Sequence, residues 1–390
     1  MGWSAFRKTG LTHYEPASAV KGYTLITPDG GDSSYLLNMQ GEVVHQWRFS
    51  GFRPGYGRLL DNGHLLLRAV DPELVATAVA NSPKADHSKL TLAQHVRQLG
   101  ANATDLLEVD WSGNIVWQYR NPAIHHDFVR LPDGNTLIPE WIELPQELAR
   151  RVRGGIRGGE KLPPMLSDDI IEIDPKGKEV RRIHLWQLLD PVRDPICPLE
   201  PRREWTHVNG LSVTRSRDIV FSCREMSRVG IIDQSGAKLL WKFGAPVTSH
   251  QHHPTVLANG NIQIFDNGMH APGWSRSRII EVDPRNNSIV WQYTADPPYQ
   301  FFSSHISSAE RLPGGNVLIC EGSAGRLFEV TPRGETVWEW INPFVSRVDG
   351  FLRPRIFRAH RYTADHPAIA GQNLAPGRYS DFNRLHGLAD

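Results

Sequence analysis

Long hydrophobic runs are missing from this 390-residue chain, since no stretch approaches the roughly 20 apolar residues that a transmembrane helix needs. An excess of one charge is missing too: 43 basic and 42 acidic side chains give a net charge of +1. This balance argues against a nucleic-acid surface or an electrostatic membrane partner. The chain has only three cysteines, at scattered positions, so no disulfide framework is indicated. With no apolar signal core at the N-terminus, we expect a cytoplasmic protein.

What the chain does have is a four-residue phrase repeated six times. It consists of a hydrophobic residue, usually Trp, any residue and then usually an aromatic residue, as in Val337-Trp338-Glu339-Trp340. The copies lie at residues 44–47, 116–119, 180–183, 240–243, 290–293 and 337–340. Most are followed by a tight Gly turn and an apolar run. Alternating apolar runs joined by such turns predict antiparallel hairpins. Repetition at a period of about 50 residues predicts an all-β fold, a β-propeller with six blades.

The repeats fill residues 20–365, which leaves residues 1–19 as an N-terminal extension and 366–390 as a C-terminal tail. We expect the strand region near residues 23–38 to complete a blade together with the C-terminal end, which would close the last sheet edge. Three insertions, at 71–106, 143–166 and 184–206, carry helix-type spacing or Gly- and Pro-rich stretches. We expect them on one rim as a lid. A propeller needs no partner, so a monomer is the default and a dimer through these insertions remains open.

Histidines recur at one register of neighbouring repeats. His126 and His252 each stand eight residues before the Gly of the following turn, and Asn209 and Ser307 align with them. His207, His250 and His305 stand two residues before Asn209, His252 and Ser307, respectively. Because equivalent blade positions converge near a propeller axis, we expect these side chains to face a common cavity. Imidazole is the side chain best suited to proton transfer, nucleophilic attack or metal binding near neutral pH.

Several phrases carry a specific resemblance. They are His125-His126-Asp127-Phe128, His207-Val208-Asn209, Gln251-His252-His253 and Phe265-Asp266-Asn267-Gly268. In this order, and over residues 20–365, the chain resembles the bacterial arylsulfotransferase family. The resemblance implies a six-bladed propeller that moves a sulfuryl group from one phenol to another without a cofactor. Its substrates would be small aromatic molecules.

The resemblance also implies roles for individual residues. His252 would accept the sulfuryl group, and His253 would replace it if the strand register were shifted by one. His126 would be the first channel histidine, His207 and Asn209 a His-x-Asn pair, and Arg224 the channel arginine. A neutral imidazole can attack sulfur, while arginine and a second histidine stabilise charge and protonate the leaving phenolate. The periplasmic enzymes that it resembles carry a secretion signal, an extra β-domain and a disulfide, and we expect this chain to differ from them in compartment and in oxidative maturation.

The number of histidines leaves two alternatives open. A metal-dependent lyase or hydrolase on the same scaffold would bind one divalent transition metal, Zn, Ni, Mn or Fe. Its ligands would come from His126, His207, His250, His252 and His305. The other alternative is a binding scaffold without catalysis. Metal analysis of the purified protein would discriminate between the two enzymatic hypotheses.

Overall fold

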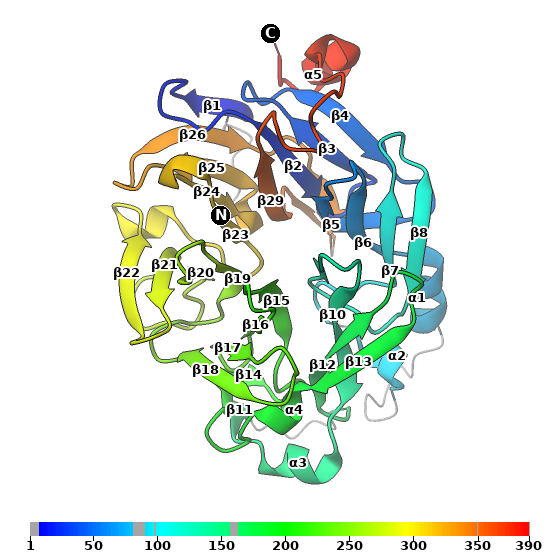
Figure 1. Ribbon diagram of the computed structural model, residues 1–390, viewed down its shortest axis with the longest axis vertical. Coiled ribbons are helices and arrows are strands. Elements are labelled where there is room, and N and C mark those ends of the chain that lie inside the picture. The colour runs from blue at the N-terminus through cyan, green and yellow to red at the C-terminus, as the bar shows by residue number, and fades with distance from the viewer. Residues whose placement is uncertain (1–7, 81–89, 97–98, 157–162, 349, 390) are drawn as a thin grey trace. The chain divides into compact units, whose positions relative to one another are not determined.

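The structure is a computed structural model that describes residues 8–80, 90–96, 99–156, 163–348 and 350–389. It divides into two compact units. The first unit comprises Met1–Ala69, Leu106–Gln118 and Ile306–Asp390, and the second comprises Val70–Asp105 and Tyr119–His305. Each unit holds three antiparallel sheets of four or five strands (Figure 1). These six sheets are the blades of a β-propeller, as the repeats predict.

The blades of the first unit use both ends of the chain. Blade 1 has the order β29-β2-β3-β4, formed by Ile356–Tyr362, Tyr23–Pro28, Ser33–Leu37 and Val43–Arg48. Blade 2 has the order β5-β6-β7-β8, formed by Arg53–Leu59, Leu65–Val70, Asp105–Val109 and Ile115–Arg120. Blade 3 has the order β1-β26-β25-β24-β23, formed by Gly10–Tyr14, Thr336–Ile341, Arg326–Val330, Val317–Glu321 and Ser308–Arg311.

The chain ends meet in these sheets. Strand β2 pairs antiparallel with β29, with Tyr23 opposite Tyr362, so the predicted closure of a blade by both ends is confirmed. Strand β1 adds a fifth strand to blade 3 by pairing with β26, although the expected boundary at residue 20 leaves it outside the propeller. In the C-terminal segment, α5 (Ser380–Leu385) packs on blade 1, where Asn383 Oδ1 accepts a hydrogen bond of 2.9 Å from the Val43 amide.

The second unit holds the other three blades. Blade 4 has the order β13-β12-β10-β9, formed by Glu179–His184, Leu166–Ile173, Thr136–Glu143 and Val129–Arg130. Blade 5 has the order β15-β16-β17-β18, formed by Val208–Val213, Ile219–Cys223, Arg228–Ile232 and Leu239–Gly244. Blade 6 has the order β19-β20-β21-β22, formed by His252–Val256, Ile262–Asp266, Arg278–Asp283 and Ser288–Tyr293.

The expected insertions all belong to the second unit and hold its helices. These are α1 (Pro72–Ala80), α2 (Leu92–Val96), α3 (Gln146–Arg151) and α4 (Leu185–Leu188). A short parallel ribbon joins β11 (Gly154–Ile156) to β14 (Ile196–Pro201). Residues 81–89, 97–98 and 157–162 of the insertions lie outside the described residues. The remaining short elements are η2 (Pro298–Gln300), η3 (Pro313–Gly315), η4 (Gly322–Ala324), η5 (Pro376–Tyr379), β27 (Ser346–Val348) and β28 (Phe351–Arg353).

The Gly turns that set the sequence register are built as predicted. Gly134 and Gly260 have φ values of 88° and 85°, a left-handed conformation that glycine adopts without a Cβ clash. Each amide donates a 2.9 Å hydrogen bond to the leucine carbonyl three residues earlier, at Leu131 and Leu257. These turns bring consecutive strands of a blade side by side.

The repeated tryptophans connect blades. Trp338 in β26 is fully buried, and its Nε1 donates a 2.9 Å hydrogen bond to the Met39 carbonyl of blade 1. Trp241 in β18 donates in the same way to Asn287 Oδ1 of blade 6, at 2.7 Å. A packing role for these residues, rather than a ligand cage, agrees with the recurrence of Trp at one register.

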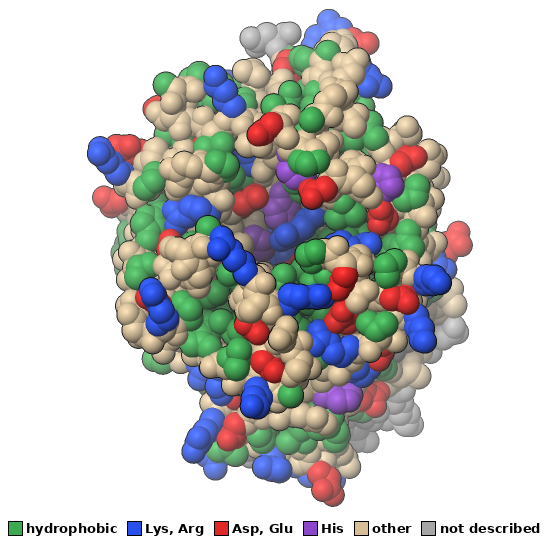
Figure 2. Space-filling model, viewed as in Figure 1, with side chains coloured by type: hydrophobic (Ala, Val, Ile, Leu, Met, Phe, Trp, Pro, Cys, Tyr) green, Lys and Arg blue, Asp and Glu red, His purple; other side chains and the backbone are tan. Residues whose placement is uncertain are grey.

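The surface carries charges of both signs. On the face displayed in Figure 2, basic and acidic side chains are interspersed. Within the described part of the chain, no helix is long and apolar enough to cross a membrane.

Candidate functional site

Two of the predicted histidines of the second unit are in direct contact. His126 precedes β9 and His207 precedes β15, and both have a left-handed backbone, with φ values of 50° and 56°. This conformation is uncommon for residues other than glycine. Their Nε2 atoms lie 3.0 Å apart, and both side chains are buried. The register argument therefore brings this pair together as expected.

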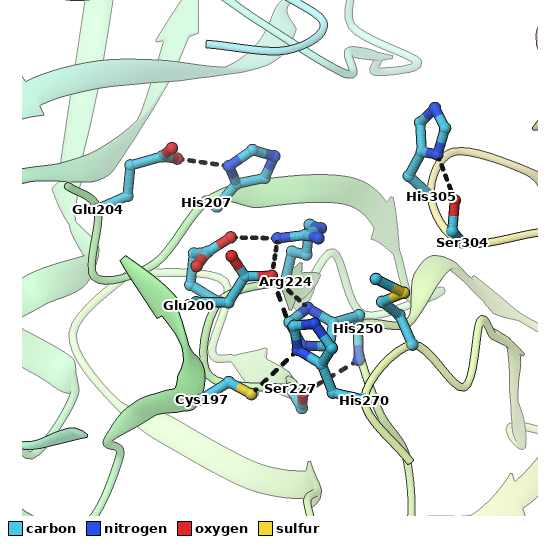
Figure 3. A network of polar contacts seen from close by, with 12 residues as sticks. Cys197, Glu200, Glu204, His207, Arg224, Ser227, His250, His270, Ser304 and His305 are labelled. Carbon is cyan, nitrogen blue, oxygen red and sulfur yellow. Dashed lines mark hydrogen bonds and ion pairs between the residues drawn. The ribbon is translucent and has the colours of Figure 1, made fainter. Parts of the chain in front are cut away.

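The contact extends at both ends to a carboxylate. His126 Nδ1 lies 2.8 Å from His125 Nδ1, and His125 Nε2 lies 2.7 Å from Asp168 Oδ1. At the other end, His207 Nδ1 is hydrogen-bonded to Glu204 Oε2, the contact drawn in Figure 3. We call the five residues from Glu204 to Asp168 the histidine relay. It consists of three imidazoles in series between two buried carboxylates.

The hydrogen bonds of the histidine relay limit where its protons can lie. Three of them join Glu204, His207, His126 and His125, and each needs one proton between its two atoms because two lone pairs at that distance repel. His125 Nε2 and Asp168 Oδ1 lie 2.7 Å apart but form no hydrogen bond. When His207 is the imidazolium, it donates to both Glu204 and His126, and His126 donates to His125.

The pKa directions agree with this assignment. Burial lowers the pKa of His207, but the adjacent Glu204 carboxylate outweighs burial, so that the pKa is raised above its usual value. For His125, burial dominates over the attraction of Asp168, and the pKa is lowered. His207, at the Glu204 end of the histidine relay, is therefore more readily protonated than His125.

Arg224 follows β16 and is held by two carboxylates. Its Nη1 lies 3.0 Å from Glu200 Oε1 and donates a hydrogen bond to Glu225 Oε1. These partners outweigh the effect of burial and raise the pKa of Arg224. Burial, followed by repulsion from Glu204, raises the pKa of Glu225 to about 7. Arg224 is thus a charged side chain in an acidic environment beside the histidine relay (Figure 3).

His252, at the start of β19, has a defined tautomer. Its Nδ1 lies 2.8 Å from Asn267 Oδ1 and 3.1 Å from the His250 carbonyl oxygen. The amide orientation of Asn267 is set by its Nδ2, which donates a 2.9 Å hydrogen bond to the Ser303 carbonyl. Since both neighbours of Nδ1 are acceptors, the neutral ring carries its proton on Nδ1. The lone pair is consequently on Nε2.

Asn209 supports the backbone that carries His252. Its Nδ2 donates a 2.8 Å hydrogen bond to the Gln251 carbonyl. The Gln251 side chain is fully buried and donates to Ser222 Oγ at 2.9 Å and to the Cys223 carbonyl at 3.1 Å. These bonds tie the segment before β19 to blade 5. Asn209 therefore holds the backbone next to His252.

The five histidines proposed as ligands of one metal do not form a common group. In the described ranges, one set of three potential ligands has donor atoms that all lie within 4.8 Å of one another, and it consists of Cys197, His250 and His270. Only His250 belongs to the predicted set. His305 Nδ1 lies 2.8 Å from Ser304 Oγ, and Figure 3 shows His305 apart from the Cys197 group. The five side chains therefore do not converge on one ion position in this structure.

The expected lid insertions contact these residues. The His126 amide donates a 2.9 Å hydrogen bond to the Ala101 carbonyl, and Asn102 forms a β-bridge with His125. Strand β14 of the third insertion supplies Glu200, the partner of Arg224. Both insertions thus lie on the side of the second unit where the candidate site is built.

Several residues of the site were not found from the sequence. Asp168 lies in β12 of blade 4, and Glu204 lies in an insertion, outside the repeat register. A signal was available for His125, which directly precedes His126, and for Glu204, which stands three residues before His207. His270 lies in the loop between β20 and β21, where no repeat pattern singles it out.

A large part of the chain matches a known protein family. The profile of the family described as arylsulfotransferase (ASST) matches residues 75–248 and 245–342. The chain is 24% identical over 244 residues to arylsulfate sulfotransferase AssT of Escherichia coli O6:H1 and, equally, to AssT of Lelliottia amnigena. Each alignment covers 42% of this chain and 41% of the relative. The chain thus spans about two fifths of the length of the relatives that it matches.

A solved structure is similar over most of the chain. It is a protein of unknown function from Bacteroides caccae, with a TM-score of 0.53 and 13% sequence identity, and the match covers 88% of this chain and 99% of that one. At this identity the likeness shows the fold alone.

Proposed function

Because the chain belongs to the arylsulfotransferase family, we propose that it transfers a sulfuryl group from an aryl sulfate to a phenolic acceptor through a covalent intermediate on His252. The observation that carries the proposal is the tautomer of His252. Asn267 Oδ1 and the His250 carbonyl both accept from Nδ1, so Nε2 holds the lone pair that a nucleophile needs. In functional histidines, a hydrogen-bond acceptor at one ring nitrogen often fixes the tautomer and leaves the lone pair on the other.

In the first half-reaction, His252 Nε2 attacks sulfur, the N–S bond forms and the bond from sulfur to the aryl oxygen breaks. The electron pair of that bond leaves on the phenolate oxygen. The imidazole ring becomes cationic, and its Nδ1–H points at the Asn267 and His250 oxygens. Dipoles aimed at a charge that develops during the reaction lower the barrier without further reorganisation.

The histidine relay supplies the proton for the departing phenolate. Its imidazolium is at the His207 end, where the Glu204 carboxylate raises the pKa of His207. A phenol has a pKa of about 10, so proton transfer from an imidazolium to phenolate is downhill. In the second half-reaction the acceptor phenol returns its proton to the histidine relay, its oxygen attacks sulfur, and the N–S bond breaks. Protons and electron pairs balance over the cycle.

Arg224 is proposed to contact the sulfuryl oxygens. Glu200 and Glu225 both contact Nη1, which leaves the donors on Nε and Nη2 for a substrate, as judged within the described part of the chain. Guanidinium donors bind tetrahedral oxyanions well. The two carboxylates fix the orientation of Arg224 before the substrate arrives.

Replacement of His252 tests the proposal. The variant His252→Ala should lose turnover of a nitrophenyl sulfate with a phenol acceptor, measured by release of the coloured nitrophenol. Wild-type protein mixed with the donor alone should gain the mass of one SO₃ group, mapped by peptide mass spectrometry to His252. The matched control is His253→Ala, which removes the neighbouring buried imidazole. Turnover by His252→Ala, or an adduct on His253, would contradict the assignment of the nucleophile.

A further inference from the structure

A second cluster of side chains in the second unit has the composition of a metal site. Cys197 and Glu200 come from β14 of the inserted ribbon. His250 precedes β19, and His270 lies between β20 and β21. Figure 3 shows the four side chains pointing toward one another from these three segments. None of the four is the proposed nucleophile or part of the histidine relay.

The donor atoms of Cys197, His250 and His270 all lie within 4.8 Å of one another, and Glu200 lies beside them. Cys197 Sγ lies 3.5 Å from His270 Nδ1. Glu200 Oε1 lies 3.7 Å from His250 Nδ1 and 3.9 Å from His270 Nδ1. A tetrahedral zinc site with bonds of about 2.0–2.3 Å has edges of roughly 3.3–3.8 Å between its ligands. The cluster is therefore close to the size that one ion requires.

His250 provides an independent indication. Its side chain is fully buried, and neither ring nitrogen has a hydrogen-bond partner among the described residues. Buried polar atoms without a hydrogen bond are rare in proteins, and each one calls for an explanation. A bound cation at Nδ1 would give this imidazole a partner in the direction where Cys197, Glu200 and His270 already converge.

We propose that Cys197, Glu200, His250 and His270 bind one Zn²⁺ ion. Thiolate and imidazole ligands select zinc over magnesium and calcium, which prefer oxygen. On binding, the Cys197 thiol releases its proton to solvent and the S–Zn bond forms, so that one thiolate and one carboxylate balance the two positive charges. A cavity of about 390 Å³ lined by Cys197 and His270 gives the ion a path to the cluster.

This inference goes beyond sulfuryl transfer, because four protein ligands make a structural site rather than a catalytic one. The ion would fasten β14 of the third insertion to blade 6. Glu200 would then be fixed beside Arg224, whose Nη1 lies 3.0 Å from Glu200 Oε1. The zinc site would in this way hold the insertion against the candidate active site.

Metal binding can be measured without any substrate. Protein stripped with a chelator under reducing conditions is titrated with Zn²⁺ against a chromophoric chelator, and the metal content is measured by elemental mass spectrometry. The wild type should bind one Zn²⁺ per chain. Cys197→Ser and His270→Gln should each weaken zinc binding by at least about tenfold, because even the loss of a residue that only supports a ligand has an effect of that size. Bound Co²⁺ should give a thiolate charge-transfer band that Cys197→Ser abolishes.

Two controls separate this proposal from others. His184→Gln changes a partly exposed histidine of the same unit, paired with Asp169, and should leave zinc binding unchanged. His252→Ala should retain zinc even if it loses turnover, so the two proposals fail separately. The zinc site would be overturned if the wild type bound no zinc. It would also be overturned if Cys197→Ser and His270→Gln both bound zinc as tightly as the wild type. Far-UV circular dichroism of metal-free variants checks that each is folded.

Discussion

The imidazolium of His207 in the histidine relay makes stability depend on pH in a predictable way. The substitution Glu204→Gln keeps an oxygen that can accept from His207 Nδ1–H but removes the carboxylate charge. In the wild type this charge outweighs burial and raises the pKa of His207. In the variant only Glu225 still opposes the effect of burial, so the pKa of His207 falls. The His207 imidazolium is then lost at a lower pH than in the wild type.

The magnitude follows from the contact that is lost. His207 and Glu204 have side chains that are 10% and 11% exposed, so the pair is little screened by solvent. A hydrogen bond to a charged group contributes about 1.5–3 kcal/mol, and we expect Glu204→Gln to lower the free energy of unfolding by about this amount in acid. A raised histidine pKa stabilises the fold fully below the unfolded value of 6.5. That stabilisation is lost as the pH rises through the folded pKa.

A neighbouring acid titrates in the same window. The pKa of Glu225 is raised to about 7 by burial and then by repulsion from Glu204. A raised carboxyl pKa lowers stability as the pH rises from its unfolded value through the folded one. Glu204→Gln removes part of this repulsion, which favours the variant at high pH. Both effects act in the same direction, so the difference between wild type and variant shrinks as the pH increases.

Urea unfolding at about pH 5.5 and about pH 9 measures this difference. Glu147→Gln makes the same chemical change on the exposed face of α3 and should have no effect at either pH. The reasoning is refuted if Glu204→Gln destabilises the protein equally at both pH values. It is also refuted if the variant is less stable than wild type only at the higher pH.

Two further substitutions test the support of His252 and the packing of the blades. Asn267→Ala removes the Oδ1 acceptor of His252 Nδ1. We expect turnover of the nitrophenyl sulfate to fall by about 10- to 100-fold, as it does when other residues that orient a functional histidine are lost. Unchanged turnover would contradict the role given to the tautomer. Trp338→Ala opens a cavity between blades 1 and 3 and should lower the free energy of unfolding, measured with urea, by about 3–5 kcal/mol. Trp274→Ala, at a side chain that is 68% exposed, should lower it little. Equal losses of stability would contradict the packing role of Trp338.

The sequence predicts the blades well because each one is a local unit. Consecutive strands are joined by short turns, and their hairpin signals lie within about 50 residues. Strand β1 escapes such reasoning, since its partner β26 is more than 300 residues away and Leu11 faces Trp340 only in the folded chain. A five-residue strand without its own hairpin has no periodic signal of its own.

The candidate site is less local than the blades. The pairing of His126 with His207 follows from repeat register, but His126 has φ 50° at a position where His252 lies in a strand. Equal spacing from a turn therefore does not give equal backbone conformation. Asp168 comes from β12, where its carboxylate accepts a 2.9 Å hydrogen bond from the Val208 amide as well as facing His125. Such contacts between blades depend on tertiary packing.

The carboxylates explain why so many basic side chains can share this interior. Glu204 pairs with His207, whereas Glu200 and Glu225 pair with Arg224. Isolated buried charges are costly, so each cation needs a nearby anion. Glu225, with a pKa of about 7, can exchange a proton near neutrality and so adjust the charge around Arg224. Under the proposed function, an anionic aryl sulfate that approaches Arg224 would meet a site whose negative charge can be reduced by one proton, without breaking the ion pair between Arg224 and Glu200.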